Sequence, residues 1–331
     1  MHTLNPVGSG DALWTDIRLQ LPRRINGVPV DHTHSMRLLA IQSLIGRFLP
    51  RLGEKLFDSM LKRMQNKSFT IRPEWGFEPP SNIIISDTLI PCLENGTIES
   101  VAAVKRISSR TEVELENGRE IDVDAIIWCT GYQSDFSIID PSFDPSYRPE
   151  QWLKAPGSNN KSLFRLYYNV FSLKKPESLA FLGNVLTAVS GFQIFDLASM
   201  AITQVWAGKS DLPSLPDMHA AVRRHHDWLV NQAHDHYNVS PGQYDAGAWV
   251  KAMDGLAGTG VNEYLGYGWK GWVFWLKERK FCNLLMDGIW SPHIHRVFNT
   301  GKRKCWDGGR EAVHKVNKSV AAMKKGKDKS A

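Results

Sequence analysis

Alternation of apolar and polar residues in the middle of the chain predicts a β-meander. Apolar residues alternate loosely over 98–107 and regularly over 111–116, and Asn117-Gly118 then provides a two-residue hairpin turn. The second arm of this hairpin runs into 121–132, where a continuous apolar run ends at Gly131. Apolar residues on both faces are typical of a strand that is covered on both sides. We therefore expect 121–132 to be a buried strand that follows the meander.

Apolar residues at helical spacing lie on both sides of the meander. One such pattern begins near Ser35, breaks at Pro50 and resumes over 52–64. Two more helices are expected after the meander, over 191–206 and from about Pro216 onward. Their predicted core positions are Phe192, Phe195, Ser199, Ile202 and Trp206 in the first, and Met218, Val222, Leu229 and Ala233 in the second. Helices mixed with short strands indicate the α/β class.

The segment 264–290 is rich in aromatic residues and is interrupted by Lys270 and the charged cluster 277–280. Its aromatic members are Tyr264, Tyr267, Trp269, Trp272, Phe274, Trp275, Phe281 and Trp290. Aromatic and basic residues together suit a helix at a membrane interface, which would give a peripheral membrane contact. A buried aromatic cluster is the alternative, and the interpretation that we prefer.

Charge and cysteine content limit the other classes of function. The net charge is +6, but residues 302–331 contain ten Lys or Arg and three acids, so the rest of the chain sums to −1. The basic character therefore belongs to a tail, and we expect no nucleic-acid partner. Four widely spaced cysteines without a CxxC pair fit a reducing compartment. With no signal-peptide pattern and no apolar run of about 18 residues, we expect a cytoplasmic location.

Common catalytic and metal-binding patterns are missing from the sequence. Histidines 225, 226, 234 and 236 lack the spacing of a helix-face ligand pair, so we expect a solvent-facing helix end and no metal. Cys129 lies in an apolar run and is expected to be a buried, inert thiol. There is no G-x-S-x-G, no G-x-G-x-x-G after a strand and no G-x-x-x-x-G-K-[ST].

One short segment resembles a known family. Cys129-Thr130-Gly131-Tyr132 is similar to the [AC]-T-G-Y segment of flavin-containing monooxygenases and related Baeyer–Villiger-type enzymes. Flanking segments agree in order and spacing, so that the resemblance covers about residues 21–316. These segments are Ile83-Ile84-Ile85-Ser86-Asp87, Asn95-Gly96-Thr97-Ile98, Phe181-Leu182-Gly183, Asp196, Ala207-Gly208-Lys209, Ser291-Pro292-His293 and Gly301-Lys302-Arg303-Lys304.

The resemblance implies a partial flavoprotein fold with two dinucleotide-binding domains, in which a three-stranded meander and parallel strands precede a helical, aromatic-rich C-terminal region. It predicts four segments. Residues 1–80 would be a mostly helical remnant of an NADP-binding domain, and 81–210 the C-terminal part of an FAD-binding domain. Residues 211–316 would be a helical and aromatic extension, and 317–331 a basic disordered tail.

The resemblance also implies a function with FAD and NADP as cofactors. In that family NADPH reduces FAD, O₂ is activated as a flavin C4a-(hydro)peroxide, and a small organic substrate is oxygenated. The positions expected to line the flavin are Thr130, Gly131, Tyr132, Gly183, Asn184, Thr187, Ser190 and Gly191. The glycine-rich motifs of the family lie N-terminal to the region seen here, which suggests a truncated enzyme. The alternative is a non-catalytic remnant that acts as an interaction or structural protein, or is completed by another polypeptide.

Overall fold

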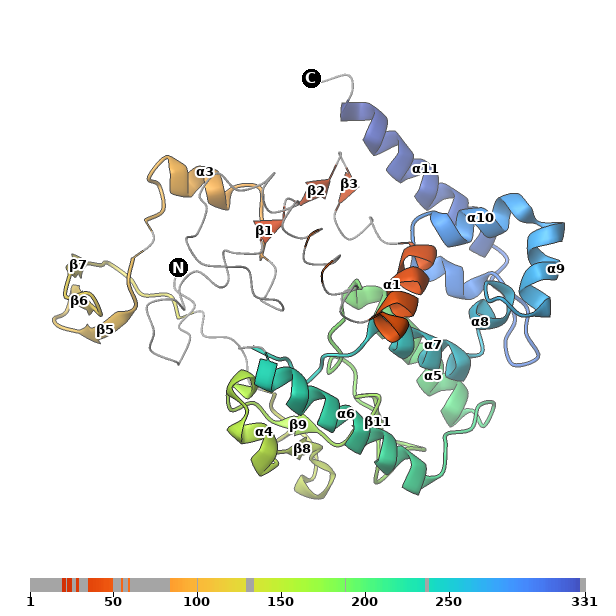
Figure 1. Ribbon diagram of the computed structural model, residues 1–331, viewed down its shortest axis with the longest axis horizontal. Coiled ribbons are helices and arrows are strands. Elements are labelled where there is room, and N and C mark those ends of the chain that lie inside the picture. The colour runs from red at the N-terminus through yellow and green to blue at the C-terminus, as the bar shows by residue number, and fades with distance from the viewer. Residues whose placement is uncertain are drawn as a thin grey trace. The chain divides into compact units, whose positions relative to one another are not determined.

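The computed structural model describes most of the chain beyond residue 83. It covers residues 84–99, 101–128, 134–187, 189–235 and 238–327, with the short pieces 20–21, 23–25, 28–29, 35–49, 55 and 59 before them (Figure 1). The chain divides into two compact units. The first, here the meander unit, comprises Met1–Arg23, Lys55–Asp135 and His236–Asn238, and the second, the helical unit, comprises Arg24–Glu54, Phe136–Asp235 and Val239–Ala331. The segments predicted from the sequence, with boundaries near residues 80, 210 and 316, stay a prediction.

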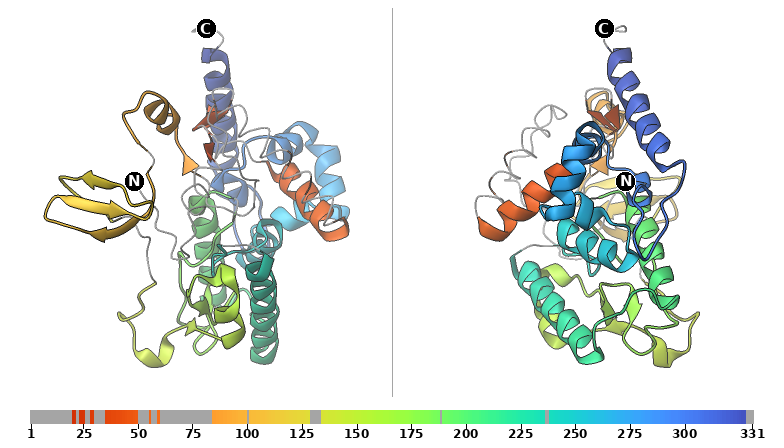
Figure 2. Two further views of the ribbon diagram at one scale, coloured as in Figure 1. Left: turned by 60° about the vertical axis from the view of Figure 1, so that its left-hand side comes forward. Right: turned by 90° about the vertical axis from the view of Figure 1, so that its right-hand side faces the viewer.

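The meander unit contains the predicted three-stranded antiparallel sheet. Strands β5 (Val104–Ile107), β6 (Glu112–Leu115) and β7 (Glu120–Asp122) pair in this order, as the left view of Figure 2 shows. The turn between β6 and β7 has three residues instead of the expected two. The Leu115 amide donates to the Arg119 carbonyl at 2.9 Å, and Gly118 has φ 80°. A left-handed glycine at the third loop position is typical of this longer hairpin.

The prediction of a buried strand over 121–132 is wrong for the part that can be seen. β7 ends at Asp122, residues 125–128 have no regular structure, and the Ile127 side chain is 77% exposed. Within the described residues β7 pairs only with β6, so the chain beyond it has no neighbouring strand to accept its hydrogen bonds. Residues 129–133, including Cys129 and its thiol, lie outside the described residues.

Parallel pairing is limited in the described part of the chain. The parallel strand pair in the meander unit is β1 (Gln20–Leu21) with β4 (Ile84–Ile85), two residues each, followed by α3 (Leu89–Glu94). The mixed α/β class is therefore confirmed, whereas the dinucleotide-binding sheets stay a prediction. Most of the second helix expected over 52–64 also lies outside the described residues.

The helical unit consists of helices joined by short β-pairs. Its strands form the antiparallel pairs β2–β3, β8–β9 and β10–β11. In chain order its elements are β2 (Arg24–Ile25), β3 (Val28–Pro29), α1 (Met36–Phe48), η3 (Pro141–Phe143), β8 (Ser146–Tyr147), α4 (Glu150–Lys154), η4 (Pro156–Ser158), β9 (Leu163–Phe164), β10 (Leu166–Tyr167), β11 (Phe171–Ser172), α5 (Gly191–Trp206), α6 (Leu215–Asp235), α7 (Ala246–Ala257), α8 (Val261–Tyr264), α9 (Trp269–Lys277), α10 (Arg279–Asp287), η5 (Pro292–Arg296) and α11 (Gly309–Lys327).

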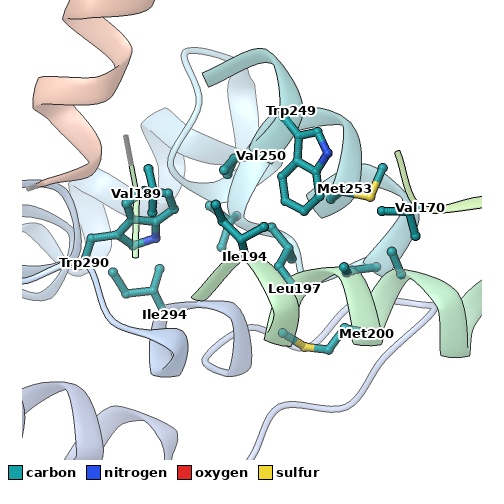
Figure 3. Packing of buried hydrophobic residues seen from close by; sticks show 14 of the residues in the cluster. Val170, Val189, Ile194, Leu197, Met200, Trp249, Val250, Met253, Trp290 and Ile294 are labelled. Carbon is teal, nitrogen blue, oxygen red and sulfur yellow. The ribbon is translucent and has the colours of Figure 1, made fainter. Parts of the chain in front are cut away.

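The core of this unit is built on α5 and α7, which pack side by side. Ile194 and Leu197 of α5 face Trp249 and Met253 of α7, and Figure 3 shows them interdigitating. The bounds predicted for α5 are confirmed, but its predicted core face is wrong in part: Phe192 is 85% exposed and Trp206 is also exposed, whereas Ile202 is buried as predicted. The aliphatic residues at i, i+3, i+4 and i+7 from Ile194 face α7 instead.

Other helices agree with the sequence more closely. The four predicted core positions of α6, from Met218 to Ala233, are all buried. At the C-terminus, however, α11 extends to Lys327, so residues 317–327 are helical and not part of a disordered tail. Val313 and Val320 on this helix are buried, and that packing stabilises a strongly basic segment as a helix. No helix within the described residues is long and apolar enough to span a membrane.

Candidate functional site

Five of the sequence-predicted site residues lie in one turn that leads into α5. This segment, here called the 183–191 turn, begins at Gly183, whose φ of 98° is open to glycine but strained for other residues. A Cβ atom at Gly183 would meet no atom within 4 Å, so glycine is needed here for backbone conformation and not for space. Thr187 accepts a hydrogen bond from the Val189 amide through its Oγ1 at 3.2 Å, which closes the turn locally.

A buried asparagine fixes the first half of this turn. The Nδ2 of Asn169 donates to the carbonyl oxygens of Asn184 and Pro241, each at 3.1 Å. Asn169 itself has φ 57°, a left-handed conformation that asparagine tolerates better than most residues. Its neighbour Tyr168 has φ 53°, and the Tyr168 carbonyl accepts a hydrogen bond from Trp249 Nε1 at 3.0 Å. Asn169, which holds the turn, therefore follows a residue that is hydrogen-bonded to Trp249 in the α5–α7 core.

The segment 240–244 runs beside the turn, close enough for hydrogen bonds between the two backbones. The Leu186 amide donates to the Gly242 carbonyl at 2.7 Å, and the Tyr244 amide donates to the Leu186 carbonyl at 3.0 Å. A Cβ atom at Gly242 would lie 2.7 Å from the Asn184 carbonyl oxygen, closer than real Cβ atoms come. Glycine at position 242 is thus required for this close approach.

The start of α5 carries free backbone donors. Ser190 is the N-cap residue, but its side chain makes no capping hydrogen bond, and its carbonyl accepts from the Gln193 and Ile194 amides. Within the described residues the amides of Gly191 and Phe192 have no acceptor. Uncapped amides and the positive end of the helix dipole attract anions and hydrogen-bond acceptors. The end of the 183–191 turn can therefore bind an acceptor atom of a ligand.

The first two turns of α5 are tied to the segment 290–296. Asp196 forms a two-bond ion pair with Arg296 of η5, with both N–O distances at 2.6 Å, and Gln193 Nε2 donates to the Trp290 carbonyl. The hydrogen bonds that Arg296 donates to Asp196 raise the pKa of Arg296. Both carboxylate oxygens are used, so Asp196 fixes the position of η5 rather than facing a ligand.

Arg296 also lines an open cleft of about 660 Å³ between η5 and residues 303–306. The lining residues are Pro292, His293, Arg296, Arg303, Lys304, Cys305 and Trp306. Partial burial and the charge of Arg296 lower the pKa of both His293 and Arg303. The cleft is cationic, and residues of the Ser291–His293 and Gly301–Lys304 segments that carried the resemblance lie in it.

His225 and His226 on α6 are not solvent-facing, contrary to the sequence expectation, whereas His234 near the end of α6 is exposed as expected. The His226 ring nitrogen Nε2 is 3.0 Å from the Phe164 carbonyl oxygen, and the His225 ring stacks on Tyr244 at a centroid distance of 3.6 Å. Burial lowers the pKa of His225 to about 3 and also lowers the pKa of His226. Both rings are therefore neutral packing groups. In the part of the chain that the structure describes, no three His, Cys, Asp or Glu side chains are grouped to hold a metal ion.

The remaining predicted site residues are Thr130, Gly131 and Tyr132, which lie outside the described residues. The structure brings Gly183, Asn184, Thr187, Ser190 and Gly191 into one turn, and their contact with a flavin stays a prediction. Sequence reasoning missed Asn169, Gly242 and Arg296. Asn169 precedes Asn184 by 15 residues and Arg296 lies 100 residues after Asp196, so no local spacing indicated these pairs.

Comparison with known proteins identifies the family of this chain. The family model described as flavin-binding monooxygenase-like matches residues 23–329. The chain belongs to this family. It is 40% identical over 303 residues to monooxygenase aurF of Gibberella zeae, an alignment that covers 90% of this chain and 57% of aurF. The family resemblance inferred from the sequence is thereby confirmed.

More distant relatives of this flavin-binding family are vertebrate proteins. Human flavin-containing monooxygenase 5 is 25% identical over 298 residues, covering 87% of this chain and 49% of that protein. Mouse dimethylaniline monooxygenase [N-oxide-forming] 2 is 27% identical over 296 residues, with coverages of 87% and 49%. The chain thus spans about half the length of the curated relatives it matches.

The family uses FAD and NADPH, and the described residues fit part of a flavin. The open Gly183 turn and the free amides at Gly191 and Phe192 suit the polar edge of a flavin ring, which presents hydrogen-bond acceptors. The sequence contains no glycine-rich loop that could hold a dinucleotide pyrophosphate. The ring end is therefore the part of FAD for which the described residues offer donors, and their contact with it stays a prediction.

Proposed function

We propose that this chain supplies the flavin-ring side of an FAD- and NADPH-dependent monooxygenase that oxygenates a small organic substrate. The observation that supports this proposal best is the uncapped start of α5 at the end of a rigidly held turn. Free amides at that place have no structural use within the described chain, whereas a bound acceptor would satisfy them.

The residues of the turn have separate tasks in this proposal. The amides of Gly191 and Phe192 donate to an acceptor on the ring, and the α5 dipole stabilises negative charge that develops there. Asn169 holds the turn through Asn184, and Gly242 holds it through Leu186, so the donors are aimed before the ligand arrives. When bound, FAD supplies the redox chemistry with NADPH as reductant and O₂ as co-substrate.

A matched pair of variants tests the donor at the start of α5. Gly191→Pro removes one amide, and proline is well tolerated at the first position of a helix. Ser190 has φ −53° and ψ 128°, a conformation that a residue before proline can adopt. Gly191→Ala retains the amide, and its Cβ atom would contact the Phe195 ring at an ordinary 3.5 Å.

The measurement is FAD affinity of the purified chain, followed by flavin fluorescence, together with NADPH oxidation. We expect roughly tenfold weaker FAD binding for Gly191→Pro, because one hydrogen bond to a polar ring atom contributes about 1.5 kcal/mol. Gly191→Ala should bind as the unmodified chain does. If both variants bind FAD with equal affinity, the Gly191 amide at the start of α5 does not donate a hydrogen bond to FAD. A chain that neither binds FAD nor oxidises NADPH would favour an interaction or structural role, or a function completed by another polypeptide.

A further inference from the structure

Helix α9 is apolar on both its inner and its outer side. Its inner side packs into the core through Gly271 and Phe274, and the Phe274 ring contacts the Phe298 ring edge-on at 5.2 Å. On the opposite side, Trp269 is 82% exposed, Trp272 53% and Leu276 72%. The spacing of i, i+3 and i+7 places these three side chains on one stripe. A helix in contact with water ordinarily has polar residues on that side.

Tyr267, 71% exposed, extends the stripe at the N-terminal end of α9. We call Tyr267, Trp269, Trp272 and Leu276 together the outer aromatic stripe. The exposure is selective, because Phe281 and Trp290 of the same aromatic-rich segment are buried in the core. The segment 264–290 therefore contains both arrangements that the sequence left open, a buried aromatic cluster and an exposed aromatic surface. One part is core, and the other part is an exposed apolar surface of a kind that marks an interaction site.

Positive charge surrounds the outer aromatic stripe. Lys270 and Lys277 are exposed on α9 itself, and Arg279 and Lys280 follow at the start of α10. Between residues 264 and 286 the sequence has one acid, Glu278, and its carboxylate is paired with Arg310 at 2.8 Å. Figure 1 shows α9 and α10 as consecutive helices at the periphery of the helical unit. The surface thus combines exposed indole rings with cations that no acid in this stretch neutralises.

We propose that the outer aromatic stripe docks the chain on the surface of a membrane that contains anionic phospholipids. Tryptophan and tyrosine rings favour the headgroup level of a bilayer, where one part of the ring is apolar and another forms hydrogen bonds. Lysines at the same depth are attracted by anionic headgroups. A protein partner fits less well, because lysine is depleted in the cores of protein interfaces. This inference does not depend on the proposed function at α5.

The test is co-sedimentation of the full chain with vesicles of phosphatidylcholine, with and without 30% phosphatidylserine, at low and high salt. We expect binding to the mixed vesicles, and at least a tenfold loss of binding when salt screens the lysines. Trp269→Ser with Trp272→Ser should weaken binding roughly a hundredfold, and Lys270→Gln with Lys277→Gln roughly tenfold, the latter only on anionic vesicles. Ile138→Ser replaces an exposed apolar residue elsewhere in the helical unit and should leave binding unchanged.

A second readout is independent of any variant. Quenching of tryptophan fluorescence by lipids brominated on the acyl chain is expected if indole rings enter the bilayer. The proposal is overturned if the chain binds neither kind of vesicle, or if the double tryptophan variant binds as the unmodified chain does. It is also overturned if sedimentation velocity shows a dimer that the tryptophan variant loses while vesicle binding persists, because a second copy of the chain would then be the occupant.

Discussion

Replacing Asn169 by alanine should release the 183–191 turn from its support. The Asn169 side chain is buried and donates to two carbonyl oxygens, those of Asn184 and Pro241. Alanine would leave both oxygens without this donor, and it would have to adopt the left-handed φ of 57°. The variant therefore combines lost hydrogen bonds with backbone strain.

The magnitude follows from these two contributions. Each lost hydrogen bond lowers the free energy of unfolding by about 1 kcal/mol. A left-handed alanine adds roughly 1 kcal/mol of strain. We therefore expect Asn169→Ala to destabilise the chain by about 3 kcal/mol. Asn169→Gly removes the hydrogen bonds without the strain and should cost about 2 kcal/mol.

Urea-induced unfolding followed by tryptophan fluorescence measures these differences. Asn160 provides a control, since it has a left-handed φ of 61° but an exposed side chain whose Oδ1 accepts from Arg148. Asn160→Ala should cost about 1 kcal/mol, mostly strain. If Asn169→Gly unfolds at the same urea concentration as the unmodified chain, the two side-chain hydrogen bonds do not support the turn and the reasoning fails.

Three further predictions concern single positions in the helical unit. Gly242→Ala should destabilise the chain by about 1–3 kcal/mol, seen as a lower Tm, because its Cβ atom would press on the Asn184 carbonyl; an unchanged Tm would contradict the close approach. Arg296→Met should lower the free energy of unfolding by about 1–3 kcal/mol in urea, since it leaves Asp196 partly buried and unpaired, and Arg296→Lys should lose less. The pKa of His225 is about 3 in the folded chain and 6.5 when unfolded, so below pH 6.5 the unfolded state binds more protons. Stability should fall by about 1.4 kcal/mol per pH unit from pH 6.5 towards pH 3, and His225→Phe should flatten that slope in urea titrations at several pH values; an identical slope would exclude His225 as its source.

Elements with local signals could be predicted from the sequence. α5 begins at Gly191 and ends at Trp206 as expected, with Gly208 in a left-handed conformation two residues later. The β5–β6–β7 meander also formed, because its hairpins join neighbours in the chain. The side that a helix buries was harder to predict from the sequence. Phe192 lies on an apolar stripe yet is exposed, since only the position of α7 decides which stripe becomes core.

The sequence by itself determined the family, the bounds of α5, the start of α6 and the order of the meander strands. These features depend on periodicity, on turn residues and on short motifs, all of which act over a few residues. The tertiary structure decided how the candidate site is held. Asn169 meets Pro241 across 72 residues, and Asp196 meets Arg296 across 100. Such pairs form only after the helices have packed, and no spacing along the chain predicts them. The outer aromatic stripe has the same physical origin, because packing of Phe274 into the core turns Trp269 and Trp272 towards solvent.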